Sequence, residues 1–458
     1  AAAAASAATP HTISICPGTY SESALTLNNA RHNGMTITST TANKADVTVA
    51  AGSGARAFDI NGRSSLTLSH LTITGNNQGV YVQNWTNGVT LDNLSITAGT
   101  TAIATSNVQS FTLSNSALVA SDDGLGMTGD AGGVTISNVT IAAGAGATDS
   151  GIEIANVYTS LSISGVTITS AGYDGIQVTN GNSLVPTFRD LRVVATRHGV
   201  YANNLRLDLG VSSLSQNVIT AGQRGIWLTG DTGPFQVRDS VITAGTGSTN
   251  YYGILATGAY NVWSVRRVTV TQAGGDAINV TGGSAPVIED VALTASRDGI
   301  VVADGNGPIV QKSAFSRNSI RVGDRGIYFS GSIGSYRIYD TDIWAGTDST
   351  NDHGIHSGNT WADYRIERNV IYQAGGRGMY IEGDSSNGVI ASNLIRGAAV
   401  EGLRVGRNPA WATATVSGNC FYNTTNIYNN YRSASFFSGS SGNFWGSSPT
   451  GSGYSDTC

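Results

Sequence analysis

The chain has 458 residues, of which 59 are glycine and only 12% are charged, so glycine is nearly twice and charge about half as frequent as in average globular proteins. The net charge of −5 excludes a strongly basic nucleic-acid-binding protein, and a hydrophobic content of 40% without a run of like charges excludes a disordered acidic tail. No segment reaches the roughly 18 to 20 apolar residues that a transmembrane helix needs. We therefore expect a folded protein with no nucleic-acid partner and no transmembrane segment.

The first predicted elements, within residues 1–50, are short and extended. Thr12-Ile-Ser-Ile15 and Leu25-Thr-Leu27 alternate apolar and polar residues, as strands do, and Pro17 and Gly18 mark a turn between them. The ends of a solenoid differ from its middle because they must be covered. We predict that residues 1–50 form an N-terminal cap and the first rungs.

Residues 51–415 carry a pattern that recurs about every 25 residues. A polar residue is followed by glycine or alanine and then by a large apolar residue, and two more strand-like runs follow, such as Val134-Thr-Ile136 and Val139-Thr-Ile141. The small-plus-apolar pairs are Ala57-Phe58, Gly79-Val80, Ala102-Ile103, Gly124-Leu125, Gly151-Ile152, Gly175-Ile176, Gly199-Val200, Gly225-Ile226, Gly253-Ile254, Ala277-Ile278, Gly299-Ile300, Gly326-Ile327, Gly354-Ile355, Gly378-Met379 and Gly402-Leu403. Three short strands per period predict an all-β protein, a single right-handed parallel β-helix of about 15 rungs.

A second repeated position precedes the third strand-like run of most rungs and holds Asn or Asp. Its members are Asn93, Asn115, Asn138, Asp190, Asp239, Asp290, Asp340, Asn369, Asn393 and Asn419. These residue types accept left-handed backbone angles, and stacked Asn side chains can form ladders, so we interpret the column as structural.

A longer repeat of about four rungs is superimposed on the short one. The segment from Ala244 to Gly253 recurs from Ala345 to Gly354, 101 residues later, and residues 143–151 are a weaker copy. Residues at the same phase of a solenoid lie on one face, so we predict that these loops project from one side. Their candidate binding residues are Tyr251, Tyr252, Asp352 and His353.

Aromatic residues also recur at the longer spacing. Trp227 matches Tyr328, and Tyr260 matches Trp361, each 101 residues apart. Rings spaced along a solenoid can stack on sugars or pack against another copy, so Trp227, Tyr328 and Trp361 are candidate binding residues. Ordinary loop packing is the alternative.

The polar residue before each small residue forms a third column, which we call the ladder. We expect the ladder to face outward and to carry any acid–base chemistry. Within it, Asp174 and His198 lie one rung apart, as do Asp276 and Asp298. Two close carboxylates should have one raised pKa and would suit a retaining glycosidase. These four are the candidate catalytic residues; a solvated ladder of mixed charges is the alternative.

The cysteines predict a C-terminal staple rather than a metal site. There is no Cys-x-x-Cys, so a zinc site is not expected. Cys420 and Cys458 both lie in the predicted C-terminal cap, residues 416–458, and a disulfide between them would indicate an oxidising compartment. We expect no cofactor, and calcium stays open as the alternative, although no acidic motif specifies it.

Two end segments, Ile15-Cys-Pro-Gly-Thr-Tyr20 and Asn443-Phe-Trp-Gly446, resemble the secreted right-handed parallel β-helix repeat proteins of the pectate-lyase-like superfamily. The resemblance implies the capped β-helix and an extracellular location, secreted or at the cell surface. It does not fix the activity, because this fold serves lyases, hydrolases, tailspikes and adhesins. The Arg-x-Lys of polygalacturonases is missing, since neither Lys44 nor Lys312 has arginine two residues earlier.

Two functions stay open. The repeated loops favour an extracellular structural or adhesive protein that presents them to a polysaccharide, a cell-surface glycan or copies of itself, because selection for one catalytic site gives no reason to repeat loops. The alternative is a secreted polysaccharide lyase or glycoside hydrolase that acts on an acidic polysaccharide.

Overall fold

A computed structural model describes residues 11–52, 56–180, 185–212, 216–230, 234–258, 263–282, 286–304, 307–313, 316–331, 333–360, 363–383, 387–405, 414–422, 427–429 and 443–445. The chain divides into two compact units, Ala1–Gly222 and Gln223–Cys458. Both consist of short parallel strands, and the one helix in the described ranges is the 3-10 turn η1 (Ala30–His32). Nothing helical in those ranges is long and apolar enough to cross a membrane.

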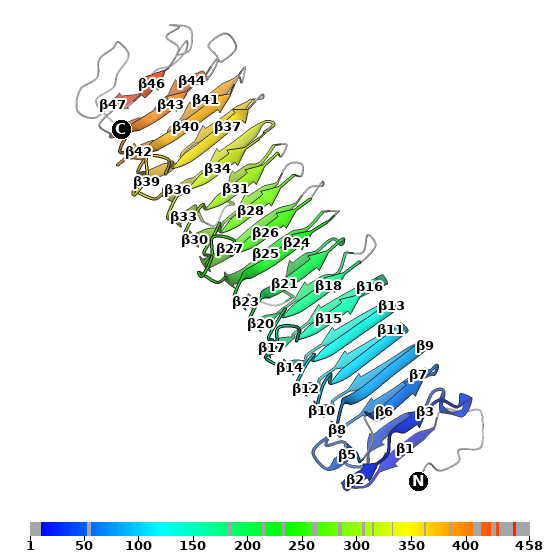
Figure 1. The fold of residues 1–458 in the computed structure, drawn as a ribbon. Coiled ribbons are helices and arrows are strands. Elements are labelled where there is room, and N and C mark those ends of the chain that lie inside the picture. The colour runs from blue at the N-terminus through cyan, green and yellow to red at the C-terminus, as the bar shows by residue number, and fades with distance from the viewer. Residues whose placement is uncertain are drawn as a thin grey trace. The chain divides into compact units, whose positions relative to one another are not determined.

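Unit 1 winds three parallel sheets around one core (Figure 1). Its first sheet contains β3 (Leu25–Leu27), β6 (Arg56–Asn61), β15 (Ile152–Ala155), β18 (Ile176–Thr179) and β21 (His198–Asn203). Its second contains β1 (Thr12–Ile15), β4 (Thr36–Ser39), β7 (Ser64–Ser69), β16 (Val157–Ser164), β19 (Thr187–Arg189) and β22 (Asp208–Gly210), and three long strands run through both sheets, β9 (Gln78–Asp92), β11 (Ile103–Ser114) and β13 (Leu125–Ser137). Its third contains β2 (Gly18–Glu22), β5 (Val47–Ala51), β8 (Thr72–Gly75), β10 (Ser95–Ala98), β12 (Ala117–Ala120), β14 (Thr140–Ala142), β17 (Thr167–Ser170), β20 (Arg192–Ala195) and β23 (Asn217–Ala221).

Unit 2 repeats this plan. Its first sheet contains β24 (Arg224–Thr229), β26 (Ile254–Thr257), β28 (Ile278–Thr281), β31 (Ile300–Ala303), β34 (Ile327–Ser330), β37 (Ile355–Thr360), β40 (Arg377–Gly383), β43 (Glu401–Val405) and β46 (Ile427–Asn429). Its second contains β29 (Val287–Glu289), β32 (Ile309–Gln311), β35 (Tyr336–Tyr339), β38 (Tyr364–Glu367), β41 (Gly388–Ala391) and β44 (Ala414–Ser417). Its third contains β30 (Ala292–Ala295), β33 (Asn318–Val322), β36 (Thr341–Trp344), β39 (Val370–Gln373), β42 (Leu394–Arg396), β45 (Cys420–Tyr422) and β47 (Phe444–Trp445), and β25 (Gln236–Thr243) and β27 (Ser264–Gln272) run through the second and third sheets.

Each strand pairs in parallel with its equivalent one rung later, and this register builds the core. Ile278 of β28 lies opposite Ile300 of β31, and Val280 lies opposite Val302. All four side chains are fully buried, whereas the intervening Asn279 faces outward. Alternation of this kind is what the sequence pattern predicts, and the predicted all-β parallel β-helix of about 15 rungs is confirmed.

Close contact between rungs explains why a small residue precedes each first-sheet strand. A Cβ atom on Gly354 would lie 2.6 Å from the carbonyl oxygen of Gly378 in the next rung, and one on Gly253 would lie 2.5 Å from that of Ala277. Since Ala277 itself occupies this column, the space varies slightly from rung to rung. Larger side chains are excluded, which explains why a small residue recurs at this position in each rung.

The Asn/Asp column is confirmed as a structural corner, in two forms. In most rungs the residue itself is left-handed, with φ 51° at Asn93 and 52° at Asp290. In the last rungs the preceding residue is left-handed instead, as at Arg368 (φ 58°), and the asparagine turns inward. The inward asparagines donate from Nδ2 to the Oδ1 of the next over 2.9–3.0 Å, and the series is Asn369, Asn393, Asn419 and Asn443.

The predicted caps and staple are only partly within the described ranges. Cys420 lies in β45, but Cys458 lies outside the described residues, so the disulfide stays a prediction. Cys16 is exposed and is a free cysteine. The predicted boundaries of the repeat, at residues 51 and 415, likewise stay predictions.

Candidate functional site

The four candidate catalytic residues of the ladder are buried, so the expectation that they face solvent is wrong. Asp174, Asp276 and Asp298 are 0% exposed, and His198 is 1% exposed. The cause is local: each carboxylate sits at the corner before a first-sheet strand, where backbone N–H groups and an arginine from the next rung surround it. A buried carboxylate needs such partners because transfer of an unpaired charge from water is very costly.

Asp276 and Asp298 lie on neighbouring rungs, as predicted, but each is held by its own arginine. The Arg297 guanidinium donates to both Asp276 oxygens at 2.6 Å. Arg325 donates to the two Asp298 oxygens at 3.0 and 2.8 Å. The Asn279 amide adds a further bond of 2.6 Å to Asp276.

These contacts change what the carboxylate pair can do. A glycosidase needs one carboxylic acid that can give up a proton and one carboxylate that is free to attack or to activate water. Here the oxygens of both groups are already engaged by guanidinium, amide or backbone donors. The geometry therefore favours two structural ion pairs over an acid–base pair.

Asp174 and His198 are joined through the backbone rather than through the imidazole. The His198 backbone N–H donates to Asp174 Oδ1 at 3.1 Å, and Arg197 holds both oxygens of the same carboxylate. Burial raises the pKa of Asp174, and the Arg197 contacts oppose that shift. The Arg197 guanidinium lies 3.3 Å from the centre of the Tyr173 ring, so this site too is an internally satisfied cluster.

The three long-repeat loops are anchored to the following rung. Each loop lies between a third-sheet strand and a first-sheet strand. Each also accepts one equivalent hydrogen bond from the backbone N–H of the next rung to a loop carbonyl: Gly172 to Gly144 (2.8 Å), Gly274 to Gly245 (2.8 Å) and Gly375 to Gly346 (2.6 Å). A second set also recurs, with Gly275 donating to Tyr251 (2.8 Å) and Gly376 to Asp352 (2.9 Å). The long repeat thus reflects a repeated loop-to-rung packing.

The predicted binding residues of these loops lie mostly within that packing. Asp352 is 3% exposed and His353 is 2% exposed, so neither is a free loop tip. Tyr251 and Tyr252 are half-buried, and the Arg297 guanidinium lies 5.9 Å from the Tyr252 ring centre. Trp361 lies outside the described residues.

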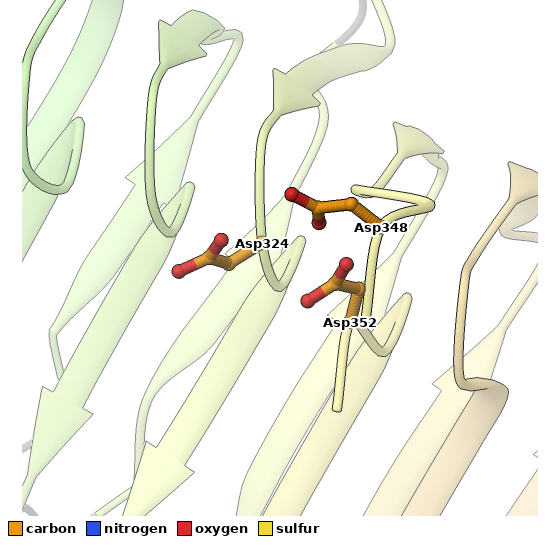
Figure 2. A group of neighbouring side chains, drawn as sticks. All are labelled: Asp324, Asp348 and Asp352. Atoms are coloured by element: carbon orange, nitrogen blue, oxygen red, sulfur yellow. The ribbon is translucent and has the colours of Figure 1, made fainter. Parts of the chain in front are cut away.

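Three carboxylates gather beside the last of these loops. Figure 2 shows Asp348 and Asp352 on the loop and Asp324 on the rung before it. One carboxylate oxygen from each residue lies within 4.8 Å of the other two. Within the described ranges, this is the group of acidic side chains that is compact enough to hold one cation. Burial and the neighbouring carboxylates raise the pKa of Asp352 to about 6. The equivalent positions of the previous loop are Gln223, Gly247 and Tyr251, which carry no acid.

An outward column of rings and arginines runs along the first sheet of unit 2. Tyr328, His356 and Tyr380 lie opposite one another on β34, β37 and β40, with ring centres 4.9 Å apart at each step. The Arg325 guanidinium lies 3.5 Å from the Tyr328 ring centre, and that of Arg377 lies 4.6 Å from the Tyr380 ring centre. We call these five residues the aromatic–arginine face.

Rings at the same position of successive rungs stack on one another, which corrects the idea that their faces are open to sugars. What the stacked rings leave accessible is their edges, because the Tyr380 hydroxyl donates to Glu382 and the two guanidinium groups also hold Asp298 and Glu401. Trp227 lies in the same sheet, on β24, with the Arg224 guanidinium 4.4 Å from its ring centre. The contact thus occurs three times, in Arg224-Gly-Ile-Trp227, Arg325-Gly-Ile-Tyr328 and Arg377-Gly-Met-Tyr380.

Sequence reasoning found Trp227 and Tyr328 but missed His356 and Tyr380. Tyr380 could have been found from Arg377-Gly-Met-Tyr380, which is a third copy of the arginine-glycine-apolar-aromatic pattern. This copy does not fall at the 101-residue spacing of the other two. His356 becomes visible only through the strand register, which places it between two tyrosines.

Both histidines near this face are neutral at physiological pH. Burial, His356 and nearby arginines lower the pKa of His353 to about 3, and burial with Arg325 and Arg377 lowers that of His356 to about 4. Both ring nitrogens of His356 are buried by the surrounding rings. A base must reach the proton that it abstracts, so His356 is poorly placed for proton transfer to a bound polymer.

Comparison with known proteins agrees with this architecture. Residues 78–242 and 252–444 match the family described as the right handed beta helix region, which is well over half of the chain. The chain belongs to this right-handed β-helix family. No curated protein matches it.

Two solved structures match this chain at low similarity. The structure of the PL6 family alginate lyase AlyGC is 8% identical, with 98% of this chain and 97% of that chain covered and a TM-score of 0.25. A variant of the same lyase is 10% identical, with 96% and 97% covered and a TM-score of 0.20. Scores this low carry no argument about activity, so the site must be judged from its own residues.

Proposed function

We propose that this β-helix binds a polysaccharide along the aromatic–arginine face and holds it without cleaving it. The observation that carries the proposal is the threefold recurrence of arginine against an aromatic ring on the outward side of one sheet. Tyr328, His356 and Tyr380 lie on three successive rungs about 4.8 Å apart, so this part of the sheet offers closely spaced ring edges to an extended polymer. Sugars suit it because they combine hydroxyls with apolar C–H surfaces.

Cleavage by a lyase or hydrolase is the competing proposal, and the candidate catalytic groups speak against it. The carboxylates of Asp174, Asp276 and Asp298 are engaged by arginines, and the His356 nitrogens are covered. Binding needs none of these groups to be free.

The test is a pair of alanine substitutions at the rings, Tyr328→Ala and Tyr380→Ala, in one chain. We expect the double variant to bind a panel of immobilised plant and bacterial polysaccharides at least about tenfold more weakly than the native chain, since stacked and hydrogen-bonded tyrosines at binding surfaces each contribute about 1 kcal/mol or more. Tyr336→Phe, at a fully buried ring of the second sheet, is the control. Unchanged binding of the double variant would reject the face.

A further inference from the structure

A second outward column, on the third sheet of unit 2, differs from the aromatic–arginine face in its charge. Arg321 of β33, Trp344 of β36, Tyr372 of β39 and Arg396 of β42 lie on four successive rungs. The Trp344 and Tyr372 rings stack with centres 4.2 Å apart and planes 4° apart. Arg321 caps the tryptophan at 3.6 Å, and Arg396 lies 5.3 Å from the tyrosine ring centre. We call these four residues the stripe.

The arginines of the stripe are exposed and lack an acidic partner in the described ranges. Asp342, two residues before Trp344 on β36, is bound by Arg317 at 3.0 Å. By contrast, the arginines of the aromatic–arginine face, Arg325 and Arg377, pair with Asp298 and Glu401. The stripe therefore carries two uncompensated positive charges on a chain whose net charge is −5.

The ring stack fixes where these charges lie. A guanidinium that rests on a ring keeps its N–H edge free for hydrogen bonding, and it binds planar carboxylates with two parallel bonds. Arg321 and Arg396 are three rungs apart, which separates them by about 14 Å along the sheet. One small anion cannot reach both, but a chain with repeated anionic groups can.

We propose that the stripe binds the carboxylates of an acidic polysaccharide and so gives the protein its preference for charged sugars. The inference takes its ligand class, a polysaccharide, from the proposed function, but it concerns a different set of residues. In the aromatic–arginine face the arginines are balanced by carboxylates, so that face alone selects sugars with little regard to charge. The strand β34 directly follows β33 in the chain, so the two surfaces lie on neighbouring sides of the same rungs.

The experiment compares polygalacturonate with its fully methyl-esterified form, which keeps the sugar rings and removes the charge. We expect the native chain to bind the acid about fivefold more tightly at low salt, as two exposed ion pairs allow, and added salt to reduce the preference. The double variant Arg321→Ala/Arg396→Ala should bind both forms equally. Arg337→Ala, an exposed arginine on β35, is the matched control and should behave like the native chain.

Replacement of the ring tests the positioning role separately. Trp344→Ala keeps both charges but removes the surface on which Arg321 rests, so it should lose part of the preference, and Trp344→Phe should restore it. If the native chain binds neither form, the inference is overturned, and the proposed function fails with it only when every other polysaccharide of the panel is left unbound as well. If the native chain binds both forms equally, or a single-stranded oligonucleotide outcompetes polygalacturonate at the stripe, only the inference is overturned.

Discussion

The arginines that hold the buried ladder carboxylates and those of the stripe are the same side chain in two opposite situations. Arg297 and Arg325 hold carboxylates that are fully buried, so they neutralise charges that the core could not otherwise tolerate. Arg321 and Arg396 rest on aromatic rings and face solvent. The difference teaches that charge content does not mark a site in a β-helix: the partner of each charge decides whether it stabilises the rungs or stays available for a ligand.

The largest effect should come from removing an arginine that holds a ladder carboxylate. Arg297→Ala leaves Asp276 buried without its guanidinium, and breaking a buried pair on one side typically costs about 3 to 5 kcal/mol. Denaturant unfolding of unit 2 should show this loss. The double variant Arg297→Ala/Asp276→Ala should recover part of it; a single variant as stable as the native chain would mean that the ladder is not structural.

A smaller loss should follow from filling the space where the last long-repeat loop meets the next rung. A Cβ atom on Gly376 would overlap the Thr350 carbonyl and the His353 ring, so we expect Gly376→Ala to lower stability by about 1 to 3 kcal/mol. Gly275→Ala, at the equivalent place under the preceding loop, should behave alike because it would overlap Thr249. Strong binding defects without any loss of stability would show instead that the loops serve a ligand.

The pH dependence of stability tests whether the His356 imidazole is buried and neutral. Because burial lowers the pKa of His356 to about 4, the unfolded chain binds more protons than the folded one between about 6.5 and 4, and stability must fall as the pH drops through that window. His356→Phe keeps the ring stack and should lose this part of the acid sensitivity.

The pH dependence of stability must be measured for two variants, because the Asp352 carboxyl changes stability with pH in the opposite direction to His356. Burial raises the pKa of Asp352 to about 6, so its contribution is fully present at low pH and is lost as the pH rises through about 6. Asp352→Asn removes that term. Melting temperatures of the native chain and both variants across pH 4 to 7 separate the two; identical profiles for His356→Phe and the native chain would contradict the buried, neutral imidazole.

The smallest effect on stability belongs to the stripe. Arg321→Ala removes an exposed side chain without an ion-pair partner, so unfolding should change by no more than about 0.5 kcal/mol. A loss as large as that expected for Arg297→Ala would show that the stripe arginines are structural as well, and the contrast between the two regions would disappear.

The sequence predicts the fold well because each rung requires the same residue types at the same positions. The small residue before each strand and the Asn/Asp corner both follow from contacts to the next rung, and both repeat at a fixed period. The burial of Asp276 and Asp298 was not predictable in this way. It depends on arginines whose position relative to the carboxylates is set by the packing of neighbouring rungs.

The stripe was missed for a related reason. Trp344, Tyr372 and Arg396 follow one another at intervals that match no motif, and the irregular pairing of β36 with β39 shifts the register between Ile343 and Trp344. The Trp344 and Tyr372 rings stack across this irregularity, where Trp344 pairs with Gln373 instead of Tyr372. Surfaces made of one residue per rung are therefore the part of a β-helix that sequence patterns predict least.

The central claim is that the protein binds a polysaccharide and does not cleave it, and one measurement tests this most directly. The native chain is titrated with polygalacturonate and other acidic and neutral polysaccharides while binding, absorbance of unsaturated products and release of reducing ends are followed in the same samples. The account predicts saturable binding to at least one polymer with no product formed after prolonged incubation. Steady formation of unsaturated or reducing ends would contradict it and would identify the protein as a lyase or a hydrolase.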